Sequence, residues 1–317
     1  MRIFLVAWFA ALLLGAGTAT SWGQRTTADA IPSGTVAASE GSIPVIRQDV
    51  REIRLVVTAT DRHGRFVRNL GPGSFDVLDD GQAVGAYLAF RAQANLPLEV
   101  GMVIDLSGSV RGRFPFEKES VSQFLRQVLH PGTDHAFVAG FNKEVTVQQG
   151  FTDNQTLLSQ AVGRLQAGGG TGLFDAIVKL CRQQWPAAAG APVRRAIMLV
   201  TDGNDNQSEA TLAAAIEAAQ RAEVIVYAVN PSDSPTVEKG DKVLNYLAEA
   251  TGGRVFYPAS RHDMNRAFAE AEEELRSQYV LSFRPVGPGA DGKFHALTLL
   301  PHVTGVQLRT RRGYYAR

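Results

Sequence analysis

Residues 96–109 read LPLEVGMVIDLSGS, and this stretch decides the fold of the chain. A largely apolar run of strand length ends in Asp105, and two hydroxyl residues, Ser107 and Ser109, follow at alternate positions. A run this apolar is typical of a central strand that is buried on both faces, as in a parallel sheet. The chain turns at the end of the run, so the three side chains can direct oxygens into one small space. Hard oxygen ligands of this kind suit Mg²⁺, Mn²⁺ or Ca²⁺ rather than a soft metal.

From this strand to about residue 276, apolar runs alternate with amphipathic helical patterns. The further predicted strands of this region span residues 135–141, 196–200, 224–229 and 254–257. The predicted helices span about residues 115–129, 154–165, 173–185, 209–222, 242–250 and 263–276. Strands that alternate with helices indicate an α/β fold, in which helices flank a doubly wound, mainly parallel sheet.

Two more loops of this region carry oxygen donors at matching places. Thr171 lies within a run of glycines, whose backbone can approach a site closely, and Asp202 follows the predicted strand 196–200. In such sheets, ligands bind beyond the carboxyl ends of the strands. Asp175 and Asp205 lie near these loops and are interpreted as helix-end and loop residues. The predicted metal ligands are Asp105, Ser107, Ser109, Thr171 and Asp202.

The three motifs together resemble a known family. They are Asp105-x-Ser107-x-Ser109, Thr171 within Gly-Gly-Thr-Gly-Leu-Phe-Asp, and Thr201-Asp202-Gly203. Over residues 94–277 the chain is similar to the von Willebrand factor type A domain. The resemblance implies a metal-ion-dependent adhesion site, at which the two serines bind the ion directly and the other three residues bind it directly or through water. A carboxylate of a partner protein would complete the coordination of the ion.

The resemblance therefore implies a protein-binding module for adhesion or assembly. Its cofactor would be Mg²⁺, or else Mn²⁺ or Ca²⁺, and its partner would be a protein that presents Asp or Glu. Two alternatives stay open. The chain could be a structural scaffold in envelope assembly with a stabilising ion, or a metal-dependent hydrolase.

The sequence offers little support for an enzyme. A haloacid dehalogenase-like phosphatase needs a second acid two residues after Asp105, where Ser107 stands. A Gly-x-Ser-x-Gly nucleophile elbow is excluded because Asp105, not glycine, stands two residues before Ser107, and no His-Glu-x-x-His motif occurs. Residues 287–293 have the glycine and lysine spacing of a phosphate loop, but Phe294 stands where Ser or Thr is needed, so a hairpin loop is predicted there. We therefore expect no catalytic residue.

The N-terminal part predicts export. Arg2 precedes an apolar run over residues 3–16 and a stretch of small residues, which is the pattern of a secretory signal peptide over residues 1–23. The run is shorter than the roughly 20 residues that a spanning helix needs, so a membrane is a partner only if the signal stays uncleaved. Residues 24–44 are rich in small polar residues and predict a flexible linker. The expected location is periplasmic or extracellular.

Composition excludes other classes of protein and site. A formal net charge of +1 gives no reason to expect nucleic acid as a partner. The single cysteine, Cys181, excludes an internal disulfide and is interpreted as a core residue.

Both flanks of the central region read as β segments, over residues 45–93 and 278–317. Each is small for a stable sheet by itself, so the two are expected to join in one β module.

Asp79-Asp80-Gly81-Gln82 is a hairpin turn signal. Asp76, Asp79 and Asp80 invite a calcium interpretation, but their spacing lacks the ligand ladder of a calcium loop, so solvated turn residues are predicted. The arginines after residue 308 predict a solvated strand end.

Overall fold

The computed structural model describes residues 52–92, 96–186, 193–231, 236–287 and 291–316. The predicted signal peptide (1–23) and linker (24–44) lie outside the described residues. Of the helices that the structure describes, none has both the length and the apolar character needed to cross a bilayer.

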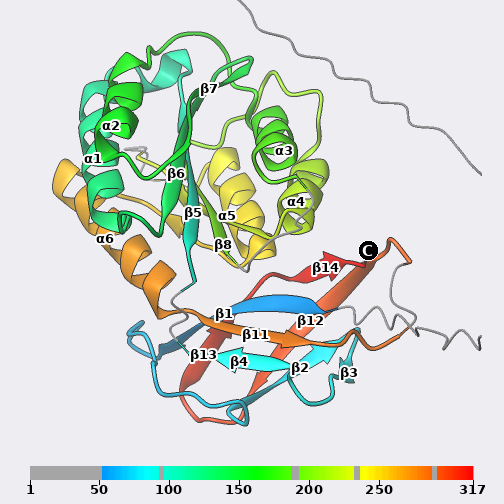
Figure 1. The fold of residues 1–317 in the computed structure, drawn as a ribbon. Coiled ribbons are helices and arrows are strands. Elements are labelled where there is room, and N and C mark those ends of the chain that lie inside the picture. Colours follow the sequence, from blue (N-terminus) through cyan, green and yellow to red (C-terminus); the bar gives the residue numbers. More distant parts are fainter. Residues whose placement is uncertain (1–51, 93–95, 187–192, 232–235, 288–290, 317) are drawn as a thin grey trace, which may run out of the picture. The chain divides into compact units, whose positions relative to one another are not determined.

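The central sheet has the predicted α/β arrangement (Figure 1). Its strand order is β10-β9-β8-β5-β6-β7, and every neighbouring pair is parallel except β6 with β7. The strands are β5 (Leu98–Asp105), β6 (His135–Phe141), β7 (Val145–Thr152), β8 (Arg194–Val200), β9 (Val224–Val229) and β10 (Val255–Phe256). β5 lies in the middle with neighbours on both sides, which explains its unbroken apolar run.

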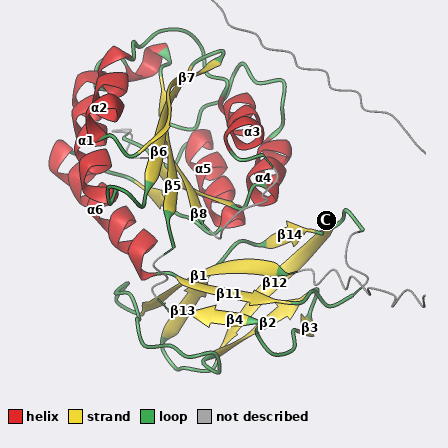
Figure 2. Ribbon diagram, in the orientation of Figure 1, coloured by secondary structure: helices red, strands yellow, loops and turns green. Residues whose placement is uncertain are grey.

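Helices cover both faces of this sheet (Figure 2). One face packs against α1 (Phe114–Val128), α2 (Gln155–Arg164) and α6 (Arg261–Ser277). The other packs against α3 (Leu173–Gln184), α4 (Leu212–Arg221) and α5 (Lys239–Thr251). Along β5, Met102 and Ile104 face the first group and Val103 faces the second, as the alternation of a strand requires. Cys181 is buried in the second core, as predicted.

Three details of the α/β domain differ from the sequence prediction. β7 was not expected, because this edge strand is half exposed and has no apolar run. α4 begins at Leu212 rather than near residue 209, since the Thr211 side chain accepts a hydrogen bond from the backbone N–H of Ala214. α5 begins earlier than expected, at Lys239, because Glu238 and Asp241 form a capping box.

Strands from the two flanks form two antiparallel sheets, as expected for the β module. Their orders are β13-β1-β11-β4 and β14-β12-β2-β3, and both contribute to one hydrophobic core. The first-flank strands are β1 (Ile53–Asp61), β2 (Phe75–Asp79), β3 (Gln82–Ala83) and β4 (Ala89–Arg91). The second-flank strands are β11 (Tyr279–Phe283), β12 (Phe294–Pro301), β13 (Val306–Arg309) and β14 (Gly313–Tyr315).

The register shows how closely the flanks are joined. β4 pairs with β11, so that Arg91 lies opposite Val280, and residues 92–278 form an insertion between these two paired strands. The loop after β11 is not the predicted hairpin, because β11 and β12 belong to different sheets. β14 was not predicted. Its Tyr314 is buried, so the chain end is not the solvated strand end that its arginines suggested.

Candidate metal centre

Asp105 ends β5 at the point where the strand order reverses. The chain proceeds from β5 to β6 on one side, and β8 lies on the other side, which makes this strand end a topological switch point. The Asp105 side chain is fully buried. It accepts hydrogen bonds from the Ser107 backbone N–H at 2.7 Å and from the Thr201 hydroxyl at 2.6 Å. Both bonds hold the carboxylate at the junction of β5 and β8.

Hydrogen bonds tie the three predicted loops to one another. The backbone N–H of Gly108 donates to the carbonyl oxygen of Gly169 at 3.1 Å, which links the serine loop to the glycine run. Thr171, in that run, donates its backbone N–H to the Asn206 side chain at 3.0 Å. Its carbonyl accepts from the N–H groups of Asn206 and Gln207, each at 3.0 Å. The structure thus brings together the loops of Asp105, Thr171 and Asp202.

The predicted ligands differ in exposure. Ser107 and Thr171 are buried, while Asp202 is half-buried and accepts a hydrogen bond from the Asn204 N–H. The backbone of Ser109 lies in the short 3-10 helix Gly108–Val110, and its side chain is outside the described part of the structure.

Helix α5 packs directly on the Asp202 loop. A Cβ atom at Gly240 would meet the Asp202 carbonyl oxygen at 2.1 Å, a distance that no real side chain tolerates. Only glycine lets the first turn of α5 come this close, and the contact sets the position of Asp202 against the end of β8.

The electrostatics of the site favour a cation. Burial raises the pKa of Asp105 above its usual value, an effect that the hydrogen bonds from Thr201 and Ser107 oppose and that the negative charge of Asp202 reinforces. A positive ion between these carboxylates would reverse both unfavourable contributions. The available donors are oxygens of carboxylates and hydroxyls, which is the donor chemistry that Mg²⁺ prefers.

Glu117 is a second buried acid near this site, and sequence reasoning missed it. It lies on α1, its side chain is 1% exposed, and one oxygen accepts a hydrogen bond from Arg113 Nε at 2.9 Å. The other oxygen has no hydrogen-bond partner among the described residues. Burial raises its pKa to about 7, and Asp105 and Asp202 contribute in the same direction. The signal in the sequence was an acid in line with the apolar positions Val121 and Phe124 of this helix.

We predict a pH-dependent stability for the Glu117→Gln variant. Between the ordinary glutamate pKa of 4.5 and the folded pKa of about 7, the folded protein keeps a proton that the unfolded chain has lost, so wild-type stability falls as pH rises through this window. Glutamine removes that penalty. The variant should therefore gain up to about 3 kcal/mol relative to wild type between about pH 4 and about pH 8, measured by urea denaturation in chelator.

The neighbouring variant Glu119→Gln is the matched control. Glu119 lies on the same helix and pairs with Arg261, but both side chains are more than half exposed, so the stability of Glu119→Gln should differ from that of wild type by less than about 1 kcal/mol throughout this pH range. If the difference in unfolding free energy between Glu117→Gln and wild type were the same at about pH 4 and at about pH 8, the assignment of the buried charge would be contradicted.

Asp175 and Asp205 hold the frame of the site, as their interpretation as helix-end and loop residues suggested. Asp175 accepts hydrogen bonds from the N–H groups of Glu209 and Ala210, and Asp205 accepts one from the N–H of Phe174. They tie the start of α3 to the loop after β8. Thr201 and Asn206 act in the same way and were not predicted, although Thr201 stands directly before Asp202 in the motif.

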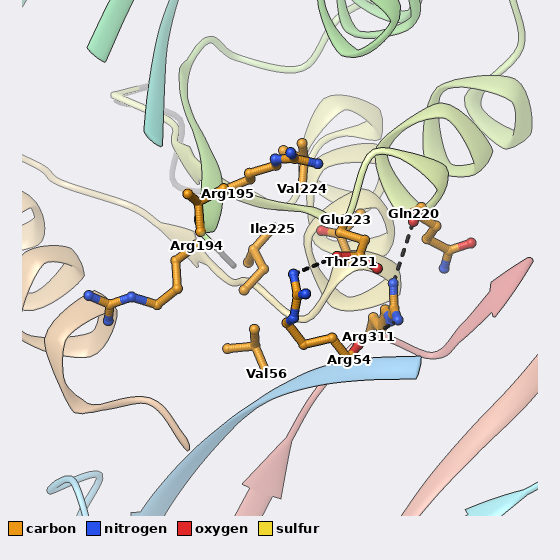
Figure 3. A pocket seen from close by; sticks show the side chains of 11 residues that line it. Arg54, Val56, Arg194, Arg195, Gln220, Glu223, Val224, Ile225, Thr251 and Arg311 are labelled. Atoms are coloured by element: carbon orange, nitrogen blue, oxygen red, sulfur yellow. Dashed lines mark hydrogen bonds and ion pairs between the residues drawn. The ribbon is translucent and has the colours of Figure 1, made fainter. Parts of the chain in front are cut away.

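A cavity at the opposite end of the sheet does not belong to this site (Figure 3). It is bounded by the starts of β8 and β9 and by Arg54 and Arg311 of the β module. Its arginines bond carbonyl oxygens: Arg195 that of Ala222 at 3.0 Å, and Arg311 that of Arg54 at 2.7 Å. The cavity is part of the junction between the α/β domain and the β module.

The fold and the candidate site define an α/β protein with a set of oxygen donors at the switch point of its sheet. The family model of the von Willebrand factor type A domain matches residues 99–270, more than half of the chain, and the chain belongs to this family. No curated protein gives a significant match.

Several solved structures are similar in fold. A von Willebrand factor type A protein from Catenulispora acidiphila is 16% identical, with 85% of this chain and 75% of that chain covered and a TM-score of 0.49. Proximal thread matrix protein 1 from the mussel byssus is 15% identical, with 62% and 49% covered and a TM-score of 0.50. BatB from Bacteroides thetaiotaomicron is 18% identical, with 57% and 100% covered and a TM-score of 0.45.

Proposed function

We propose that the protein is an exported, divalent-metal-dependent binding module that holds an acidic group of a partner protein. The ion, Mg²⁺ by preference and Mn²⁺ or Ca²⁺ otherwise, would be held by Asp105, Ser107, Ser109, Thr171 and Asp202. Export is inferred from the signal-like residues 1–23. The proposed activity is binding rather than catalysis.

The observation that supports this proposal most is the pairwise bonding of the three loops around Asp105. The serine loop is bonded to the glycine run, the glycine run to the loop after Asp202, and Asp105 itself to Thr201 at the end of β8. Each contact limits the freedom of a loop that carries a donor. An ion would therefore meet donors that are already positioned, and little binding free energy would be lost in ordering them.

The donor set also leaves room for an outside carboxylate. Two of the five side chains are carboxylates, which formally balance the charge of the divalent ion, and three are neutral hydroxyls, so no surplus of negative charge at the ion would repel a further carboxylate. Mg²⁺ often retains waters, and a carboxylate can replace one of them. Asp202 is half-buried whereas Asp105 is fully buried, so the solvent reaches the site from the side of Asp202. A partner would approach from that side.

The proposal is tested by capture of partners from an envelope extract. The immobilised wild-type chain should retain a protein in Mg²⁺ and release it in chelator. Thr171→Val, which exchanges the hydroxyl for a methyl group, should retain none, and the exposed Thr156→Val should behave as wild type. Amidation of the carboxylates in the extract should abolish capture, because the ion would have no anion to bind.

Capture that persists in chelator or in Thr171→Val would contradict the adhesion proposal. The scaffold alternative has its own signature. Mg²⁺ would then raise the melting temperature of the wild-type chain, while no extract would contain a partner whose capture depends on the ion.

A further inference from the structure

The β module contains a second cluster of possible metal ligands, on a different sheet from the first. Asp79 ends β2, Asp80 follows in the β2–β3 turn, and His295 lies on β12. Each residue offers one possible ligand atom, and these three atoms all lie within 4.8 Å of one another. The prediction of solvated turn residues holds for Asp80; Asp76 is exposed but lies within β2, and Asp79 is only 1% exposed, so the prediction is wrong for Asp79.

The protein fixes one end of each of these side chains and leaves the other end facing the cluster. Asp79 Oδ2 accepts hydrogen bonds from the Tyr314 hydroxyl and the Val286 N–H, both at 2.9 Å. Asp80 Oδ1 accepts one from the Ala296 N–H at 2.8 Å. The remaining oxygen of each carboxylate is directed toward the imidazole.

His295 is oriented in the way that metal-bound histidines are. Its Nε2 lies 3.2 Å from Asp291 Oδ1, and its ring stacks on Tyr314 with centroids 5.2 Å apart. A carboxylate on the outer ring nitrogen fixes the tautomer and makes the inner nitrogen a better ligand. That inner nitrogen, Nδ1, is the one that faces Asp79 and Asp80.

Two buried atoms in this cluster have no hydrogen-bond partner among the described residues, namely Asp79 Oδ1 and His295 Nδ1. Nδ1 lies 3.9 Å from Asp79 Oδ1 and 2.9 Å from Asp80 Oδ2, but without the alignment of a hydrogen bond. A buried carboxylate oxygen without a hydrogen-bond partner costs free energy. A cation between Asp79 Oδ1, Asp80 Oδ2 and His295 Nδ1 would give each of these three atoms a partner. Ligand atoms around one zinc ion are about 3 to 3.5 Å apart, so only small side-chain movements are needed.

We propose that Asp79, Asp80 and His295 form a binding site for a divalent transition-metal ion of the Zn²⁺ class, with Asp291 as the carboxylate that orients the histidine. An imidazole nitrogen with two carboxylate oxygens suits Zn²⁺, Co²⁺ or Mn²⁺ better than Mg²⁺. The Asp80 side chain is 53% exposed, which leaves a path for the ion and room for water ligands. The ion would join the β2–β3 turn to β12.

The test uses Co²⁺ as a spectroscopic probe on the full chain in excess Mg²⁺, which occupies the oxygen-only site of the α/β domain. Wild type should bind one equivalent of Co²⁺ with visible d–d absorption, and Zn²⁺ should displace it. His295→Gln and Asp80→Asn should each weaken binding at least about 10-fold. Asparagine suits position 80, whose φ of 48° lies in the left-handed region.

Asp76→Asn is the matched control, because Asp76 also pairs with a histidine, His302, but at an exposed position outside the cluster. Its Co²⁺ affinity should equal that of wild type, and so should that of Asp105→Ala. Absence of a one-to-one Co²⁺ complex in wild type would overturn the proposal. So would binding that His295→Gln leaves intact or that Asp105→Ala removes.

Discussion

Replacing Asp105 by asparagine should lower the affinity for Mg²⁺ or Mn²⁺ by about 100-fold or more, beyond the 10- to 100-fold that the loss of an outer-shell partner costs. Asparagine has nearly the same shape: its one carbonyl oxygen can accept the hydrogen bond from the Ser107 N–H, and its NH2 group can donate to the Thr201 hydroxyl oxygen, which reverses the direction of that bond. The change therefore removes a negative charge at the end of β5 and little else. Isothermal titration calorimetry measures the affinity directly.

The same substitution should act in the opposite direction on stability. Burial raises the pKa of Asp105, which means that the folded protein holds its charged form at a cost in free energy. Above that raised pKa, removal of the charge relieves the cost, so the variant in chelator should melt at the same temperature as wild type or higher. Lower affinity combined with undiminished stability is the signature of a residue kept for binding rather than for folding.

Asp134→Asn is the matched control. Asp134 is also fully buried, but it accepts a hydrogen bond from Leu98 at the opposite end of β5 and pairs with Arg276. Its replacement should lower the melting temperature and leave metal affinity unchanged. Equal metal affinities for wild type and Asp105→Asn would contradict the assignment of the site.

Replacing Glu274 by alanine should destabilise the protein by about 3 kcal/mol or more. Glu274 lies on α6 with a side chain that is 1% exposed. It accepts a hydrogen bond from the Tyr227 hydroxyl at 2.7 Å, and it pairs with Arg254 at 3.0 Å and with Arg309 of β13. Alanine would leave the Tyr227 hydroxyl without its acceptor and the two guanidinium groups without their carboxylate at the junction between the α/β domain and the β module.

Glu273 provides a control one residue away. It also pairs with an arginine of the β module, Arg68, but the two side chains are 56% and 50% exposed. Such pairs contribute less than about 1 kcal/mol, so Glu273→Ala should cost little. Urea denaturation of the two variants compares them. Equal losses would show that burial of the Glu274 network adds nothing to stability.

The sequence predicts the α/β domain well because its signals are local. β6 and β9 have the predicted limits, since buried parallel strands read as continuous apolar runs that end at turn residues. β7 escaped because an edge strand needs no such run. The starts of α4 and α5 are set by the caps at Thr211 and Glu238. The spacing of apolar residues, from which these helices were predicted, does not show where a cap lies.

The candidate sites differ in how much of them is visible in the sequence. Asp105 and Asp202 follow the ends of neighbouring strands, so the topology of a parallel sheet predicts that their loops meet, whereas Thr171 lies between α2 and α3 and was assigned to the site by its motif. Glu117 and Thr201 escaped because their roles depend on packing against those loops. Tyr314, which donates to Asp79, and His295, which faces it, are more than 200 residues away in the sequence, and only the register of β12 brings them to Asp79.

The pairing of β4 with β11 has a consequence for the order of folding. Arg91 and Val280 are neighbours in this sheet, so the contact closes a loop that contains the whole α/β domain. Closing so long a loop in a disordered chain costs conformational entropy that a few strand hydrogen bonds do not offset, so the contact would form slowly. Once the α/β domain is folded, its own compactness brings the two ends close. Folding should therefore proceed from the middle of the chain outward. β1 is synthesised early but cannot pair until its partners, β11 and β13, have been synthesised.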